Sequence, residues 1–156
     1  MLGNAVVSAP VFSQSLPDPD SQTAAFIESN IPGALGLLNT YQLALNECDA
    51  VLFEQVVNND AWIVGFPTDS ARQLGGNTAW FESLCEGGGR YDVQFSPPSA
   101  LYLEGGYILV IQIGGSRLSP AGDEDVFRLV VSLYVREIEA DRRMIIYSHS
   151  SRLPEE

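Results

Sequence analysis

The sequence predicts an α+β fold in which a curved antiparallel sheet wraps around N-terminal helices, and two observations indicate this. Apolar residues recur at three- and four-residue intervals between Thr23 and Val57, which is the spacing of amphipathic helices. From residue 90 onward the chain consists of long runs rich in β-branched and aromatic residues, separated by turns. Such strands are long for a domain of this size, which favours a strongly curved sheet.

The length of 156 residues fits one domain with a core of its own. Residues 1–22 are rich in proline, serine and aspartate and contain one short apolar patch, so we interpret them as an N-terminal extension. Residues 23–156 form the predicted domain.

Helices are expected first in this domain. The apolar spacing from Phe26 to Cys48 predicts helical structure, and Pro32 suits the first turn of its longer helix. Asp49 is the expected cap of a second helix, AVLFEQVVNND. The short run AWIVGFP that follows predicts a strand, which ends at Pro67.

A short helix and four long strands complete the predicted order. In GGNTAWFESLCEGGG, Asn77 or Thr78 is the expected cap, and the glycines from Gly87 to Gly89 end the helix. The strand segments are RYDVQFSPPSALYLE, YILVIQIGG, VFRLVVSLYVREIE and RRMIIYSHSS.

The third and fourth strand segments are apolar on nearly both faces, and the third shows this pattern in full. One face holds Phe127, Leu129, Val131, Leu133 and Val135, and the other still carries Val126, Val130 and Tyr134. Antiparallel sheets usually expose one face to water, so a sheet this apolar needs two covers. Helices supply one cover, and we expect a homodimer to supply the other, through the convex face around Ile108–Ile113 and Phe127–Val135.

The charge of the chain excludes several classes of partner and of chemistry. Its 20 acidic residues against 8 arginines give a formal net charge of -12, and the sequence contains no lysine. An acidic surface repels phosphate backbones and anionic lipids, so we expect no nucleic-acid partner and no membrane partner. Without lysine there is no Schiff-base chemistry.

The cysteines and the single histidine indicate neither a metal site nor a cofactor. Cys48 and Cys85 lie 37 residues apart without metal-ligand spacing, and we interpret both as small buried apolar residues. The N-terminus has no leader-like charge pattern, and no run of apolar residues is long enough to span a bilayer. The expected location is therefore the cytoplasm.

Three stretches resemble a known family. The run TYQLALNECDAVLFEQVVNNDAWIVGFP, the turn and helix GGNTAWFESL, and the ending EADRRMIIYSHSS are similar to the nuclear transport factor 2-like superfamily, also called cystatin-like or ketosteroid isomerase-like. The ending resembles the SnoaL-like branch in particular, although Arg143 or Met144 stands where that branch has an aromatic residue. The resemblance spans Phe26 to Leu153. It implies a cone-shaped sheet around the helices, with an apolar pocket at its open end.

The catalytic residues of this superfamily carry over poorly. Tyr41 matches the tyrosine of the ketosteroid isomerases, but the position of their proton-moving aspartate falls on Gly65, and their second acid falls near Leu133. The paired carboxylates of the related epoxide hydrolases have no counterpart, since Asp92 is the one acid inside a predicted strand. Proton abstraction by either mechanism needs those acids, so the catalytic residues stay unassigned.

The last strand contains the only histidine, in MIIYSHSSRL. Alternation along a strand predicts one face that holds Ile145, Tyr147, His149 and Ser151. We predict that His149 lies at the rim of the pocket and that Tyr41 approaches it across the cavity. A Ser–His–Asp triad would combine Ser148 or Ser151 with His149 and Asp92, and of the two serines only Ser151 shares a face with His149, but no GxSxG turn is present. The expected ligand-binding residues are Tyr41, Trp80, Tyr147, His149 and Ser151.

Two functions remain open. The first is a SnoaL-like protein that binds a small, mostly apolar molecule in the cone, or isomerises, cyclises or dehydrates it. The second is a non-catalytic oligomerisation module that resembles the association domain of calcium/calmodulin-dependent kinase. The missing carboxylates and the doubly apolar sheet favour the second, and the hydroxyl and imidazole groups of the last strand favour the first.

Overall fold

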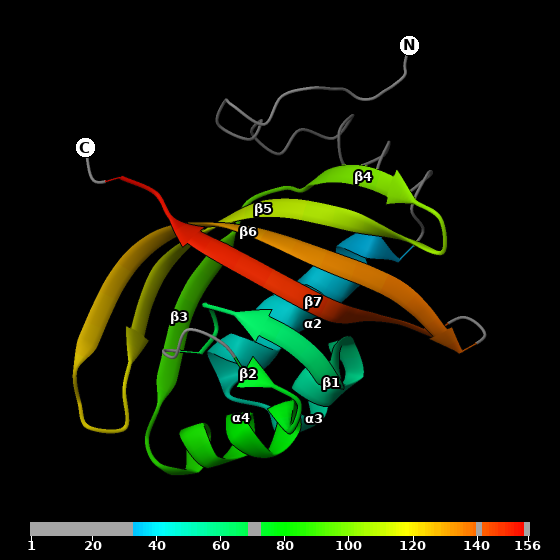
Figure 1. Cartoon of the computed structure of the whole chain (residues 1–156). Coiled ribbons are helices and arrows are strands. Elements are labelled where there is room, and N and C mark those ends of the chain that lie inside the picture. Colours follow the sequence, from blue (N-terminus) through cyan, green and yellow to red (C-terminus); the bar gives the residue numbers. More distant parts are fainter. Residues whose placement is uncertain (1–32, 69–72, 140–141, 155–156) are drawn as a thin grey trace.

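Three helices lie against one side of a strongly curved sheet in the computed structural model, which describes residues 33–68, 73–139 and 142–154 (Figure 1). The helices are α2 (Ala34–Glu47), α3 (Ala50–Val56) and α4 (Asn77–Glu86). The strands are β1 (Val57–Val64), β2 (Gln73–Leu74), β3 (Arg90–Phe95), β4 (Ser99–Leu103), β5 (Gly106–Leu118), β6 (Glu124–Glu139) and β7 (Arg142–Arg152). None of the described helices is long and apolar enough to cross a membrane. The expected helical residues before Gly33 lie outside the described part of the chain.

The described strands form one sheet in the order β2-β1-β7-β6-β5-β3, and β4 also pairs with β5. The pairs are antiparallel except for β1 and β7, which run parallel. The sheet is therefore mostly antiparallel, and the predicted α+β architecture is confirmed. The long central strands β5, β6 and β7 bend over the helices, as the strand lengths predict (Figure 1).

The strand β2 was not predicted, and Gly76 rather than Asn77 or Thr78 is the N-cap of α4. Two strand boundaries also differ from the sequence prediction. Helix α3 ends at Val56 and β1 begins at Val57, four residues earlier than expected, because β-branched valines continue readily as a strand. The segment expected as one strand from Arg90 is two strands, since Pro97 and Pro98 have no backbone N–H for ladder hydrogen bonds. Asp49 caps α3 as predicted, because its carboxylate accepts hydrogen bonds from the first backbone N–H groups of the helix.

Helix α2 is fastened to the free edge of β3 by two side-chain amides. The Asn46 amide donates to the Val93 carbonyl at 2.9 Å and accepts from the Val93 N–H at 2.8 Å. The Gln42 side-chain oxygen accepts from the Phe95 N–H at 2.8 Å. These bonds satisfy backbone groups that an edge strand would otherwise expose, and they fix the helix against the sheet.

The core lies between the helices and the concave face of the sheet. In β6, the side chains of Phe127, Leu129, Val131, Leu133 and Val135 are all buried, whereas their sequence neighbours point away. The prediction that these five residues share one face is confirmed. Val131 is fully buried on the helix side, so the expected dimer interface on the convex face does not include it.

Candidate functional site

A bulge in β7 decides which way the polar end of that strand points. Val135 of β6 lies opposite Ile145, and the next residue, Tyr134, lies opposite Tyr147, so Ile146 is an extra residue in the ladder. Directly opposed residues share a face. Ile145 therefore points into the core, where it is 1% exposed, while Tyr147 points outward. The prediction that these two residues share a face is wrong, because simple alternation takes no account of the bulge.

The outer face of the sheet carries a continuous row of apolar side chains, which we call the aromatic row. Its five members lie directly opposite one another on five neighbouring strands: Trp62, Tyr147, Tyr134, Ile108 and Leu101. Trp62 and Leu101 at its two ends are 53% and 50% exposed, and Tyr147 is 38% exposed. Large apolar groups in a contiguous exposed patch mark an interaction surface more strongly than scattered ones.

His149 belongs to the adjacent row of the same outer face. It lies opposite Ser132 of β6 on one side and Val64 of β1 on the other, and its side chain is exposed. Ser151, opposite Val130, points the same way. The three predicted site residues of the last strand thus lie together on one face. That face is the convex one, so the predicted place of His149 at the rim of the concave side is wrong.

Tyr41 and Trp80 lie on the other side of the sheet. Tyr41 of α2 is 1% exposed, and its ring contacts those of Phe53 and Phe95. Burial raises the pKa of the Tyr41 phenol far above its usual range, with a smaller contribution from Tyr91. Trp80 of α4 is partly buried against Phe81. The structure therefore does not bring Tyr41 together with His149, and their predicted meeting across a cavity is wrong.

A chain of aromatic rings occupies the interior between the helices and the sheet. Successive ring centroids are 4.3 to 6.3 Å apart, from Tyr41 through Phe53, Phe81, Tyr91 and Phe66 to Phe127. Phe81 is stacked with both Phe53 and Tyr91, and the other pairs meet edge-on or tilted, which are favourable arrangements. Aromatic side chains thus line the region that the resemblance assigns to an apolar pocket.

The inward-facing residues of β7 are serines rather than the histidine. The Ser150 hydroxyl accepts a hydrogen bond from the Phe66 N–H at 2.8 Å. Ser148 lies opposite Leu133 and Ile63, is 1% exposed, and its hydroxyl has no hydrogen-bond partner. A buried hydroxyl without a partner is uncommon, so Ser148 is a polar group on the concave face with unused hydrogen-bonding capacity.

Acid–base machinery is missing from the part of the interior that the structure describes. The buried polar residues there are Thr68, Asn77 and Ser148, and none is a carboxylate. Asp92, the one acid predicted within a strand, points outward and is exposed. The described residues also contain no group of three or more His, Cys, Asp or Glu side chains arranged to hold a metal ion. The arrangement can bind and position, but it offers no base for proton abstraction.

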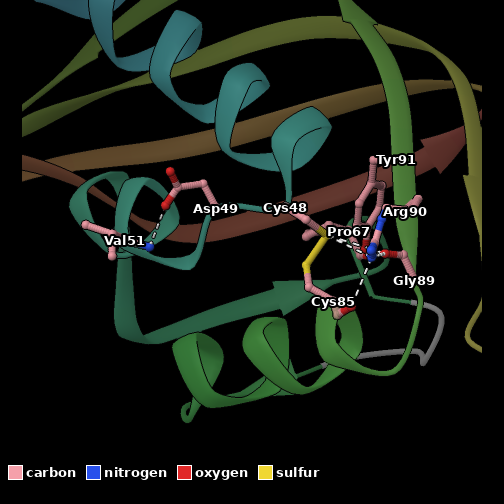
Figure 2. The surroundings of a disulfide bond; sticks show 8 residues. All are labelled: Cys48, Asp49, Val51, Pro67, Cys85, Gly89, Arg90 and Tyr91. Carbon is pink, nitrogen blue, oxygen red and sulfur yellow. Dashed lines mark hydrogen bonds between the residues drawn. A yellow bond between two sulfur atoms is a disulfide. The ribbon is translucent and has the colours of Figure 1, made fainter.

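Cys48 and Cys85 form a disulfide, which corrects their interpretation as separate buried residues (Figure 2). Cys48 ends α2 in a left-handed conformation, with φ at 54°, and its Cα lies 5.8 Å from that of Cys85 in the last turn of α4. The Arg90 guanidinium donates to the carbonyls of Cys85 and Gly89 at 2.9 and 2.5 Å. The disulfide and this arginine together hold the helical layer against the start of β3.

Sequence reasoning missed the residues that define the two faces. Trp62, Tyr134 and Leu101 were not among the predicted site residues, although Trp62 and Tyr134 each alternate with buried neighbours. Ser148 was assigned to the opposite face from His149, which is correct, but the side that faces the helices was not recognised. The extra residue, Ile146, lies between Ile145 and Tyr147 and is defined by the register of β7 against β6, so periodicity along the chain gave no signal for it.

No protein-family model matches the sequence, and no curated protein matches it either. Solved structures do match. A nuclear transport factor 2-like superfamily protein from Salmonella enterica is similar over 85% of this chain and 94% of its own, with a TM-score of 0.63 and 10% identity. A ketosteroid isomerase-like protein from Erwinia carotovora covers 78% of this chain and 94% of its own, with a TM-score of 0.62 and 12% identity.

The CaMKII hub from S. rosetta is also similar, over 88% of this chain and 100% of its own, with a TM-score of 0.57 and 9% identity. Sequence identities this low support a shared fold but not a shared activity. The chain therefore has the nuclear transport factor 2-like fold that its sequence predicts.

Proposed function

We propose that this domain is a non-catalytic self-association module that pairs with a second copy through the outer face of its sheet. The observation that carries the proposal is the aromatic row, in which Trp62, Tyr147 and Leu101 stay exposed in the single chain. Burying a large apolar side chain is worth about 1.5–3 kcal/mol, so a symmetric pair of such rows supplies a substantial driving force.

The interior supports the same proposal, because the buried residues that the structure describes include no acid–base group suited to catalysis. Aromatic rings pack against one another between the helices and the sheet, and no carboxylate is buried among the described residues. The similarity to the CaMKII hub agrees with a structural role, although at 9% identity it carries only the fold. His149, Tyr147 and Ser151, predicted to contact a ligand, are then proposed to contact the second copy.

A matched pair of variants tests the interface. Leu101 on the outer face and Leu43 on α2 are 50% and 49% exposed, so a glutamate at either position changes the same amount of exposed apolar surface. We expect the 16.9 kDa chain to sediment as a dimer in analytical ultracentrifugation. Leu101→Glu should raise the dimer dissociation constant by about tenfold or more, since it places a charge in an apolar contact. Leu43→Glu should leave it unchanged.

Two results would overturn this proposal. One is a wild-type chain that remains monomeric at high micromolar concentration. The other is an equal effect of both glutamates, which would point to the added negative charge of an acidic chain rather than to the outer face.

Ser148 favours a second candidate, the binding of a small and mostly apolar molecule that carries a carbonyl or hydroxyl group. Its buried hydroxyl has no partner, and a ligand oxygen would supply one. Native mass spectrometry of the purified protein should then show an added mass that disappears in Ser148→Ala. A spectrum that contains the chain mass alone would count against binding, and with it against isomerisation, cyclisation or dehydration.

The disulfide supports an oxidising compartment rather than the cytoplasm that the sequence alone predicts. Disulfides such as Cys48–Cys85 persist where thiols are not kept reduced. Alkylation of freshly lysed cells without a reductant should leave both cysteines unmodified. Alkylation of both would instead support a reducing location.

A further inference from the structure

The last inward-facing row of the sheet contains an unusual ion cluster. Arg117 of β5 lies directly opposite Tyr91 of β3 on one side and Asp125 of β6 on the other. Arg152, near the end of β7, reaches the same aspartate. The cluster is separate from the aromatic row, which lies on the other face of the sheet.

The charges in this cluster do not balance. Nη2 of Arg152 lies 2.5 Å from Oδ2 of Asp125, and Nη2 of Arg117 lies 3.7 Å from the same oxygen. The second distance is too long for a hydrogen bond. One carboxylate therefore faces two guanidinium groups and satisfies one of them, which leaves an excess of one positive charge.

Arg117 is the arginine whose guanidinium group lacks a hydrogen bond to the shared aspartate. Its side chain is only 16% exposed, yet within the described part of the chain its one polar contact is the long ion pair with Asp125. A guanidinium carries five N–H donors and is seldom buried without partners. Tyr91 cannot help, because its hydroxyl already donates to the Pro67 carbonyl.

We infer that Arg117 and Arg152 form a binding site for a small carboxylate, which bridges the two guanidinium groups beside Asp125. A carboxylate matches the planar fork of a guanidinium with two parallel hydrogen bonds, and it neutralises the excess charge. This inference goes beyond self-association, since it assigns a ligand class to the concave side of the sheet. Asp123 and Glu124 directly precede Asp125 in the chain, and their negative charges disfavour anions of higher charge such as phosphate.

The wild-type protein allows a direct test. Nuclear magnetic resonance of the arginine Nε–Hε groups would follow a titration with sodium acetate, with sodium chloride replaced so that the ionic strength stays constant. We expect the Arg117 and Arg152 signals to shift and to saturate. The signal of Arg136, an exposed arginine at the opposite end of β6, should move little.

Two variants separate a site from general charge attraction. Arg117→Lys keeps the charge but loses the fork, and it should weaken acetate binding by about tenfold. Asp125→Asn removes the competing carboxylate, and it should tighten acetate binding by about threefold or more. Circular dichroism confirms that both variants fold.

Three outcomes overturn the inference: unsaturable shifts, shifts of equal size at Arg117 and Arg136, or weaker binding in Asp125→Asn. Saturable binding of inorganic phosphate without binding of acetate would contradict the carboxylate class.

Discussion

The two faces of the sheet are both apolar, yet the structure covers only one of them. Along β6, Val131 and Leu133 point toward the helices and are fully buried, while Val130 and Tyr134 point outward and are only partly covered. The two sets alternate in the same strand, so local sequence cannot tell them apart. An apolar composition therefore indicates that a face of the sheet must be buried against something. Which of the two faces the helices bury is determined by tertiary packing.

The largest expected effect comes from placing the same charge on each face. Val131→Asp buries an unpaired carboxylate and should lower the free energy of unfolding by about 4 kcal/mol or more. Val130→Asp, on the outer face, should lower it by about 1 kcal/mol or less. Urea denaturation followed by circular dichroism measures both. Equal losses would show that the outer face is as tightly covered as the inner one.

The disulfide is the next largest contribution, because it fastens the helical cover over the concave face. The bond joins two cysteines with a sequence separation of 37 residues. Because it restricts the unfolded chain, it raises the free energy of unfolding by about 3–4 kcal/mol. Reductant should lower the stability of the wild type by that amount. The double variant Cys48→Ala/Cys85→Ala should start lower and should not respond to reductant. If reductant leaves the free energy of unfolding of the wild type unchanged, the disulfide does not have a stabilising role.

The two inward serines of β7 give a finer comparison within one face. Ser150→Ala leaves the Phe66 N–H without its acceptor and should cost about 1–3 kcal/mol. Ser148→Ala removes a buried hydroxyl that has no partner, so it should be neutral or stabilise the ligand-free fold by about 1 kcal/mol. Thermal unfolding of both variants tests this order, and a larger loss in Ser148→Ala would reveal an unseen bond.

Alkaline pH should separate a buried tyrosine from an exposed one. Burial raises the pKa of Tyr41 in the folded state, so above pH about 10 only the unfolded chain loses this proton, and stability falls as the pH rises. Between pH 10 and 11 the wild type should lose about 1 kcal/mol more than Tyr41→Phe. The chain has no lysine and its cysteines are disulfide-bonded, so tyrosines dominate this range.

Tyr147→Phe, which removes an outer-face hydroxyl, is the control for this experiment. Its free energy of unfolding is measured across the same range of pH. If Tyr41→Phe and Tyr147→Phe respond alike, the loss of stability does not come from the burial of Tyr41.

The sequence by itself determined the order of the helices and of the long strands, but not the short strand β2. Alternation correctly separates the two faces of β6, and the capping role of Asp49 follows from its position before a helix. These features depend on residues within a few positions of one another, where propensity and periodicity act directly. The proline pair Pro97 and Pro98 also explains, from local chemistry, why β3 and β4 are separate strands.

Only the tertiary structure decided which residues meet. A single extra residue in β7 separates the face of Ile145 from that of Tyr147, and it is visible only in the register against β6. The Cys48–Cys85 bond depends on how the ends of α2 and α4 pack, and the shared aspartate of Arg117 and Arg152 depends on three strands in register. Contacts between residues far apart in sequence follow from the assembled sheet, because each is set by packing rather than by its neighbours in the chain.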